Sequence, residues 1–363
     1  MSHSPETPAP KSGLARVHVA TMLVAVGCFV LTAVFVFHAV FDGGLLGGGL
    51  VNSDTLILPE IHWNMIHRTD GWFAHQHSRQ NSVLPDQLLH HLLAPWLGDF
   101  RSVLPGQVTL TLLAEIGLGA TLVARTTRVS SGVAWTVTTF VVLAACLITL
   151  NWPLHAQMAA PINHSGGFAL SLVFALLIGR GPRDPLVLAL VAAGCFSDTL
   201  FLAMAVVPWI AGRLTLDPPE RWSWRALRPF LPVALAVVVG IAAQSLVFHQ
   251  HNRAPPPTAI LDFLRAVTHD GRPMTVVAIA IVALAASAFR LGRADGVEPA
   301  TRAIDAFASV AMASSLAAMI VFWIDHWSLR YAWPAVGWPL ILLARALAPR
   351  IDGIVMGIGW IAA

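Results

Sequence analysis

The chain has 363 residues, of which 56% are apolar and only 11% are charged. Because soluble proteins carry about 25% charged residues, this composition excludes an ordinary soluble enzyme, a nucleic-acid-binding domain and a disordered scaffold. The net charge is only +3, and no run of basic residues predicts a nucleic-acid partner. Apolar stretches of membrane-spanning length recur, so the sequence predicts an all-α fold, a polytopic transmembrane helical bundle of about 10–11 membrane helices.

In chain order, polar residues 1–17 are expected to form a cytoplasmic tail, followed by a single transmembrane domain over 18–363. Apolar runs predict spans near 18–41, 107–124, 132–150, 165–179, 230–248, 274–290, 303–324 and 332–347. The stretch 348–352 is expected to be an inner connection, and the apolar residues 351–363 are too few to cross the membrane. Most Lys and Arg then fall on one side, which predicts a cytoplasmic N-terminus.

The run 185–212 has arginines at both flanks and Ser197 and Asp198 near its middle. Arginines at both flanks favour the cytoplasm on both sides, so we expect a short helical hairpin with Ser197 and Asp198 near its outer tip. The alternative is one long tilted helix.

A long first outer loop, 42–106, contains two stretches with apolar residues at helical spacing, near 56–66 and 88–97. Neither is long enough to span, so both are expected to be helices in the outer interface. A second outer loop, 249–273, is rich in proline.

Most of the 15 histidines and most aspartates fall in the predicted outer regions, which favours a functional site on the outer face. Asp54, in the sequence Asn52-Ser53-Asp54-Thr55, follows the first span by a dozen residues and precedes an interfacial helix. A carboxylate at that position can act as a general base or bind a divalent cation. Alternatively, Ser53 or Asp54 caps the helix that follows.

Two further segments carry candidate side chains. Asp198 is a carboxylate inside an apolar run, where such residues are costly and often functional; capping of the second hairpin arm is its alternative role. The segment Asp325 to Tyr331 includes His326 and Arg330. An interfacial arginine can bind a phosphate with two hydrogen bonds, or it can extend to the interface as part of an aromatic belt. Histidine pairs such as His90 and His91 lack the spacing of a zinc motif.

The position of Asp54, the Asn81–Asp86 stretch ending in Pro85-Asp86, the Ser197-Asp198 pair and the late Arg330-Tyr331 together resemble the GT-C class of membrane glycosyltransferases. Unlike many members, the chain is not expected to carry a large C-terminal soluble domain. The resemblance implies a bacterial inner-membrane enzyme that moves a sugar from a polyprenyl-phosphate-linked donor to an acceptor on the extracytoplasmic face, with inversion.

The same resemblance implies roles for individual residues. Asp54 would be the catalytic base or a metal ligand, with Asp198 as a second ligand if Mg²⁺ or Mn²⁺ takes part. Substrate contacts would come from six residues: Asp86, Asp198, Arg330, Tyr331, Arg79 and His326. The expected partners are the lipid bilayer and the lipid-linked donor.

Three other functions fit the same pattern. Short paired helices with a polar break are also typical of a transporter or flippase of a lipid-linked or small polar substrate. The outer histidines are compatible with a membrane acyltransferase. A non-catalytic assembly subunit is the third.

Overall fold

The computed structural model describes residues 11–41, 62, 67, 83–148, 165–218, 227–248, 257–292, 298–323 and 333–362. All regular structure in these ranges is helical, and no strand occurs in them. The all-α class expected from the sequence is therefore confirmed for the described part of the chain.

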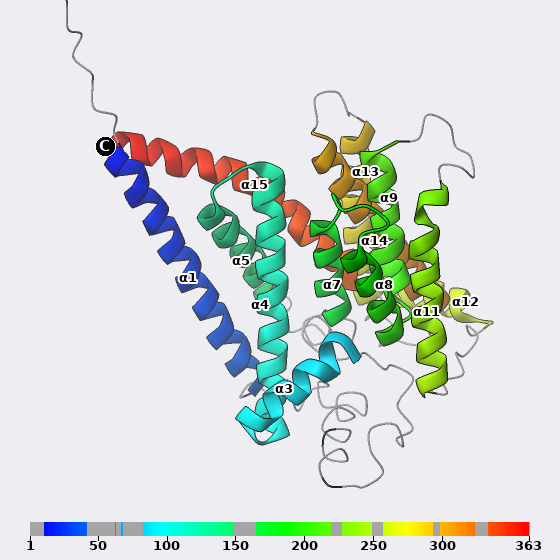
Figure 1. Ribbon diagram of the computed structural model, residues 1–363. Coiled ribbons are helices and arrows are strands. Elements are labelled where there is room, and N and C mark those ends of the chain that lie inside the picture. Colours follow the sequence, from blue (N-terminus) through cyan, green and yellow to red (C-terminus); the bar gives the residue numbers. More distant parts are fainter. Residues whose placement is uncertain are drawn as a thin grey trace, which may run out of the picture.

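The helices form two groups, which contact each other both directly and through the last helix (Figure 1). The first group holds α1 (Lys11–Phe41), α3 (Leu88–Leu97), α4 (Phe100–Thr127) and α5 (Ser131–Ile148). The second group holds α7 (Ser165–Leu176), α8 (Pro185–Ser197), α9 (Val207–Leu216), α11 (Leu231–Phe248), α12 (Ala259–His269), α13 (Gly271–Gly292) and α14 (Pro299–Val321). Helix α15 (Trp333–Ala362) packs against α1, α4 and α5 on one side and against α13 and α14 on the other.

In the described part of the chain, four helices are long and apolar enough to cross a membrane: Arg101–Thr127, Arg228–Val247, Pro273–Gly292 and Pro299–Val321. Several helices also present large apolar side chains on the outside, such as Leu23 and Leu31 on α1 and Leu235 on α11. Such exposure is costly in water and favourable in lipid. The helices are thus suited to a bilayer.

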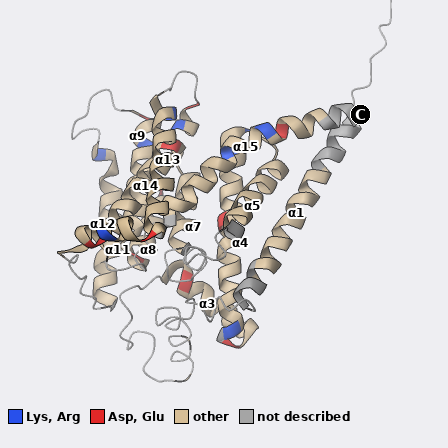
Figure 2. Cartoon of the chain, turned by 180° about the vertical axis from the view of Figure 1, so that it is seen from behind, with Lys and Arg blue, Asp and Glu red and all other residues tan. Residues whose placement is uncertain are grey.

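The molecule has two chemically different ends. We call the end where α4, α9 and α13 finish and α14 begins the arginine end (Figure 2); its described arginines include Arg125, Arg128, Arg180, Arg183, Arg213, Arg290 and Arg302. We call the opposite end, where α3 and the short η3 helix (Val83–Gln87) lie, the loop end. Helix α4 runs from the loop end to the arginine end.

The chain segment that forms α8 and α9 begins at the arginine end and returns to it. Asp184 caps the N-terminus of α8, because its carboxylate accepts hydrogen bonds from the backbone N–H groups of Leu186 and Val187. The helix ends at Ser197. The chain is extended at Asp198 (φ −153°, ψ 119°) and then turns back. Trp209 Nε1 of α9 donates to the Leu177 carbonyl (3.3 Å), and Arg213 donates to the Ile178 carbonyl (3.2 Å).

The returning arm contains a widened helical turn, η4 (Leu202–Val206). A widened turn weakens the regular ladder of backbone hydrogen bonds. Two serines from neighbouring helices compensate: Ser171 donates to the Met204 carbonyl (2.7 Å), and Ser314 donates to the Ala203 carbonyl (2.5 Å). These bonds tie α7 and α14 to the returning arm, as hydroxyl groups do between membrane helices.

Two elements differ from the sequence prediction. The expected inner connection 348–352 is wrong, because α15 continues as one helix through Pro349 to Ala362. Asp352 is held within it by a hydrogen bond from Ser130 Oγ (3.3 Å). The Pro-rich outer loop 249–273 contains α12, whose Phe263 packs edge-on against Trp323 with ring centroids 5.3 Å apart.

Candidate functional site at the loop end

The described part of the chain contains two of the seven site residues expected from the sequence, Asp86 and Asp198. The other five lie outside the described residues: Asp54, Arg79, His326, Arg330 and Tyr331. The predicted interfacial helix near 88–97 is present as α3, whereas only His62 of the stretch 56–66 is described.

The structure brings the segments of Asp86 and Asp198 together at the loop end. Ser197 Oγ donates a hydrogen bond to the Leu84 carbonyl (2.8 Å) and accepts one from the Leu84 backbone N–H (2.7 Å). Leu84 has extended backbone angles (φ −118°, ψ 129°) inside η3, which leaves both of its backbone groups available to the serine. One buried hydroxyl therefore holds the end of α8 beside the Pro85–Asp86 segment.

Asp86 lies inside the protein, with 0% of the residue exposed. Its carboxylate faces the first turn of α7: a Cβ atom built on Gly166 would lie only 2.9 Å from Asp86 Oδ1. The backbone N–H groups at a helix N-terminus favour a nearby negative charge. This placement makes Asp86 suited to fixing the positions of η3 and α7 relative to each other.

A chain of hydrogen bonds connects Asp86 to the histidines of α3. Gln107 Nε2 donates to the Asp86 carbonyl (3.0 Å), and Gln107 Oε1 lies 3.2 Å from His90 Nδ1. Because an amide oxygen only accepts, His90 Nδ1 is the donor in this pair. The bond thus fixes the tautomer of the neutral ring, with its proton on Nδ1.

Three histidines pack together beside this chain: His62, His90 and His91. The Nδ1 atoms of His62 and His91 are 2.8 Å apart, and their rings are stacked with centroids 5.1 Å apart. Burial lowers the pKa of His90 to about 4, and the neighbouring histidines add to this effect, while the Gln107 hydrogen bond partly opposes it. Burial, followed by repulsion from a neighbouring histidine, also lowers the pKa of His62 and His91. The cluster is therefore neutral at pH 7.

Asp198 begins the returning arm. Its Oδ1 accepts a hydrogen bond from the Leu200 backbone N–H (2.9 Å), and its carbonyl accepts one from the Phe201 N–H (3.0 Å). The side chain thus performs the capping role that the sequence allowed as an alternative. Capping uses one carboxylate oxygen, so it does not exclude a second role for Asp198.

Metal binding at this end is not supported by the described residues. Among them, no group of three or more His, Cys, Asp or Glu side chains has an arrangement that could hold a metal ion. The expected metal pair of Asp54 and Asp198 includes one residue outside the described part of the chain, and so it stays a prediction.

The close approach of η3 to α7 requires a glycine at position 166. A Cβ atom there would lie 2.4 Å from Cδ and 2.5 Å from Cγ of Pro85, whereas a Cβ on Gly167 would meet Met204 only at 3.4 Å or more. We expect Gly166→Ala to lower the free energy of unfolding by about 1–3 kcal/mol through overpacking, because the Pro85 ring is rigid. Gly167→Ala is the matched control. Thermal unfolding of both variants in detergent is the measurement; equal midpoints would contradict the tight contact.

A buried ion cluster that the sequence analysis missed lies near the arginine end. Asp305 of α14 accepts a hydrogen bond from Arg345 of α15 (2.8 Å), and Arg290 of α13 lies 3.3 Å from the same oxygen. The side chains of Asp305 and Arg345 are only 3% and 6% exposed. The available signal was an aspartate at the third position of the apolar run 303–324.

Comparisons with known proteins give no match. No protein-family model, no curated protein and no solved structure matches this chain.

Proposed function

We propose that the protein is a polytopic membrane glycosyltransferase of the GT-C type. In this proposal the loop end faces the extracytoplasmic side of a bacterial inner membrane, and the arginine end faces the cytoplasm. The enzyme transfers a sugar from a polyprenyl-phosphate-linked donor to an acceptor, with inversion.

The observation that supports this function is the pair of hydrogen bonds between Ser197 and Leu84. These bonds join two segments that are far apart in the chain and that each carry a carboxylate, Asp86 and Asp198, at one end of a set of apolar helices. A transferase that uses lipid-linked sugars needs such groups where membrane meets water, since its donor carries the charged phosphate there.

The residues divide into two kinds of role. Asp54 is proposed to take the proton from the acceptor hydroxyl, and Arg330 to stabilise the departing phosphate, with Arg79, Tyr331 and His326 as further substrate contacts. Asp198 lies at the turn of the returning arm, where it is proposed to contact the acceptor or a Mg²⁺ or Mn²⁺ ion shared with Asp54. Asp86 is a positioning residue, because it is fully buried.

The direct test is sugar transfer from a panel of polyprenyl-phosphate-linked sugars by the purified protein. We expect Asp54→Asn to lower the rate about 10²–10⁴-fold, the usual contribution of a general base. Asp262→Asn is the control, because Asp262 lies on α12 in a solvent-accessible ion pair with Arg265. Rates for Asp54→Asn equal to those of the wild type would disprove the assigned role, and a rate unaffected by EDTA would exclude the metal-dependent form.

A transporter is the second candidate, supported by the break at Asp198 between two short helices. Broken helices of this kind often form substrate sites in transporters. The two functions are separated by the fate of the substrate: a transferase consumes the donor and yields a new glycosidic bond, whereas a transporter moves an unchanged molecule across a vesicle membrane.

A further inference from the structure

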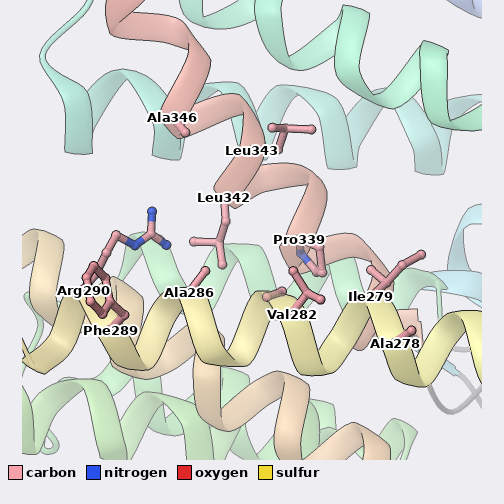
Figure 3. Close-up of a pocket in the computed structure, with 11 residues that line it drawn as sticks. Ala278, Ile279, Val282, Ala286, Phe289, Arg290, Pro339, Leu342, Leu343 and Ala346 are labelled. Atoms are coloured by element: carbon pink, nitrogen blue, oxygen red, sulfur yellow. The ribbon is translucent and has the colours of Figure 1, made fainter.

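An apolar groove lies between α13 and α15 on the outside of the helix assembly (Figure 3). It has a volume of about 680 Å³, and its walls include Ile279, Val282 and Phe289 of α13 and Pro339 and Leu343 of α15. Small residues such as Ala286 form its floor in Figure 3. Because both helices lie in apolar runs of the sequence, the groove opens where a bilayer would surround the protein.

The length of the groove corresponds to one leaflet. Along α13 it extends from Ala278 to Arg290, a rise of about 18 Å at about 1.5 Å per residue. Half of a hydrocarbon core of about 30 Å is about 15 Å. An extended acyl chain of a glycerophospholipid therefore fits the groove from the bilayer midplane to the level of Arg290, whereas a much longer isoprenoid chain would extend beyond it.

The groove has a cationic end. Arg290 lines it near the arginine end, with 36% of its side chain exposed, and its guanidinium group extends toward α15 in Figure 3. Arg290 shares the single carboxylate of Asp305 with the buried Arg345. Two guanidinium groups and one carboxylate carry a net charge of +1, and the Nε–H groups of both arginines have no acceptor in the described part of the chain.

We propose that this groove binds one acyl chain of an anionic glycerophospholipid, with the lipid phosphate on Arg290. The phosphate supplies the negative charge that Asp305 alone does not provide, and arginine matches phosphate oxygens with paired hydrogen bonds. The site lies at the arginine end, opposite the proposed transfer site. It rests on the chain being a membrane protein, and it holds whether or not the protein transfers sugars.

The test is native mass spectrometry of the protein after detergent extraction from vesicles of equal parts phosphatidylglycerol and phosphatidylcholine with identical acyl chains. We expect the wild type to retain phosphatidylglycerol selectively. Arg290→Gln should lower that selectivity roughly tenfold or more, the effect of losing a hydrogen bond to a charged group. Arg128→Gln, which changes an exposed arginine paired with Glu298 at the same end, should leave it unchanged.

A second pair of variants tests the apolar part without touching the ion cluster. Ala286→Phe places a ring inside the groove, while Ala285→Phe adds the same ring at an exposed neighbouring position that does not line it. We expect Ala286→Phe alone to reduce lipid retention. Equal retention of the two lipids by the wild type, or identical retention by the two phenylalanine variants, would overturn the proposal. This pair also decides the question if Arg290→Gln fails to fold.

Discussion

Replacing Asp305 with Asn is expected to lower the free energy of unfolding by about 3–5 kcal/mol, the usual cost of removing one partner from a buried ion pair. The carboxylate is the shared partner of Arg290 and Arg345. The Asp305 carboxylate lies 2.8 Å from the Arg345 guanidinium group. Without it, Arg345 keeps a buried positive charge that has lost this counterion. Thermal or denaturant unfolding of the purified protein in detergent measures the effect.

Two comparisons make this prediction specific. Asp262→Asn removes the exposed partner of Arg265 on α12, and it should cost less than about 1 kcal/mol, as surface pairs do. Replacing Asp305, Arg290 and Arg345 together with Leu, Met and Met should restore most of the lost stability, because apolar groups can replace a buried ion cluster at little cost. A triple variant that is as unstable as Asp305→Asn would show that shape, rather than uncompensated charge, determines the loss.

Acidification from pH 7 to pH 4 is expected to destabilise the loop end, chiefly through His90. Its pKa is lowered to about 4 in the folded protein by burial, against about 6.5 in an unfolded chain. As the pH falls below 6.5, the unfolded chain binds a proton that folded His90 does not, so the stability decreases until the pH reaches about 4. The full loss from this one residue is about 3 kcal/mol.

The check is the thermal midpoint at pH 7 and at pH 4.5 for the wild type and for His90→Asn. Asn keeps a side-chain N–H near the position of Nδ1 and does not titrate, so the variant should lose less stability on acidification than the wild type. His269→Asn changes an exposed histidine on α12 and should behave like the wild type. If His90→Asn and the wild type show the same decrease, another group causes the acid sensitivity.

The all-α class could be predicted from the sequence because helix formation depends on local patterns. The apolar run near 107–124 falls inside α4, and the run near 303–324 largely coincides with α14. Local patterns were misleading where a residue type that is common in loops also occurs in or beside a helix. The stretch 348–352, which contains Arg350, was expected to be an inner connection, but α15 continues through it to Ala362. Pro255, Pro256 and Pro257 favoured a loop, but α12 begins at Ala259, directly after them.

The contacts of the candidate site could be predicted only in part, since they join distant residues. Asp198 was singled out as a carboxylate inside an apolar run, and Asp86 through the family resemblance of the Asn81–Asp86 stretch. No pattern indicates that Ser197 would bind Leu84, which is 113 residues away. The ion cluster was missed for the same reason: Asp305 and Arg345 are separated by 40 residues and meet only when α14 packs on α15. Isolated polar residues in apolar runs indicate that a partner exists without identifying it.

The hydrogen bonds between Ser197 and Leu84 also determine when the loop end can form during synthesis of the chain. Ribosomes add about 5–20 residues per second, so the serine, 113 residues further along the chain, emerges about 6–23 s after the leucine with which it pairs. During that interval α3 and α4 are already available to fold, whereas the Pro85–Asp86 segment has no α8 to hold it. The contact between Ser197 and Leu84 therefore cannot form until synthesis has passed the middle of the 363-residue chain.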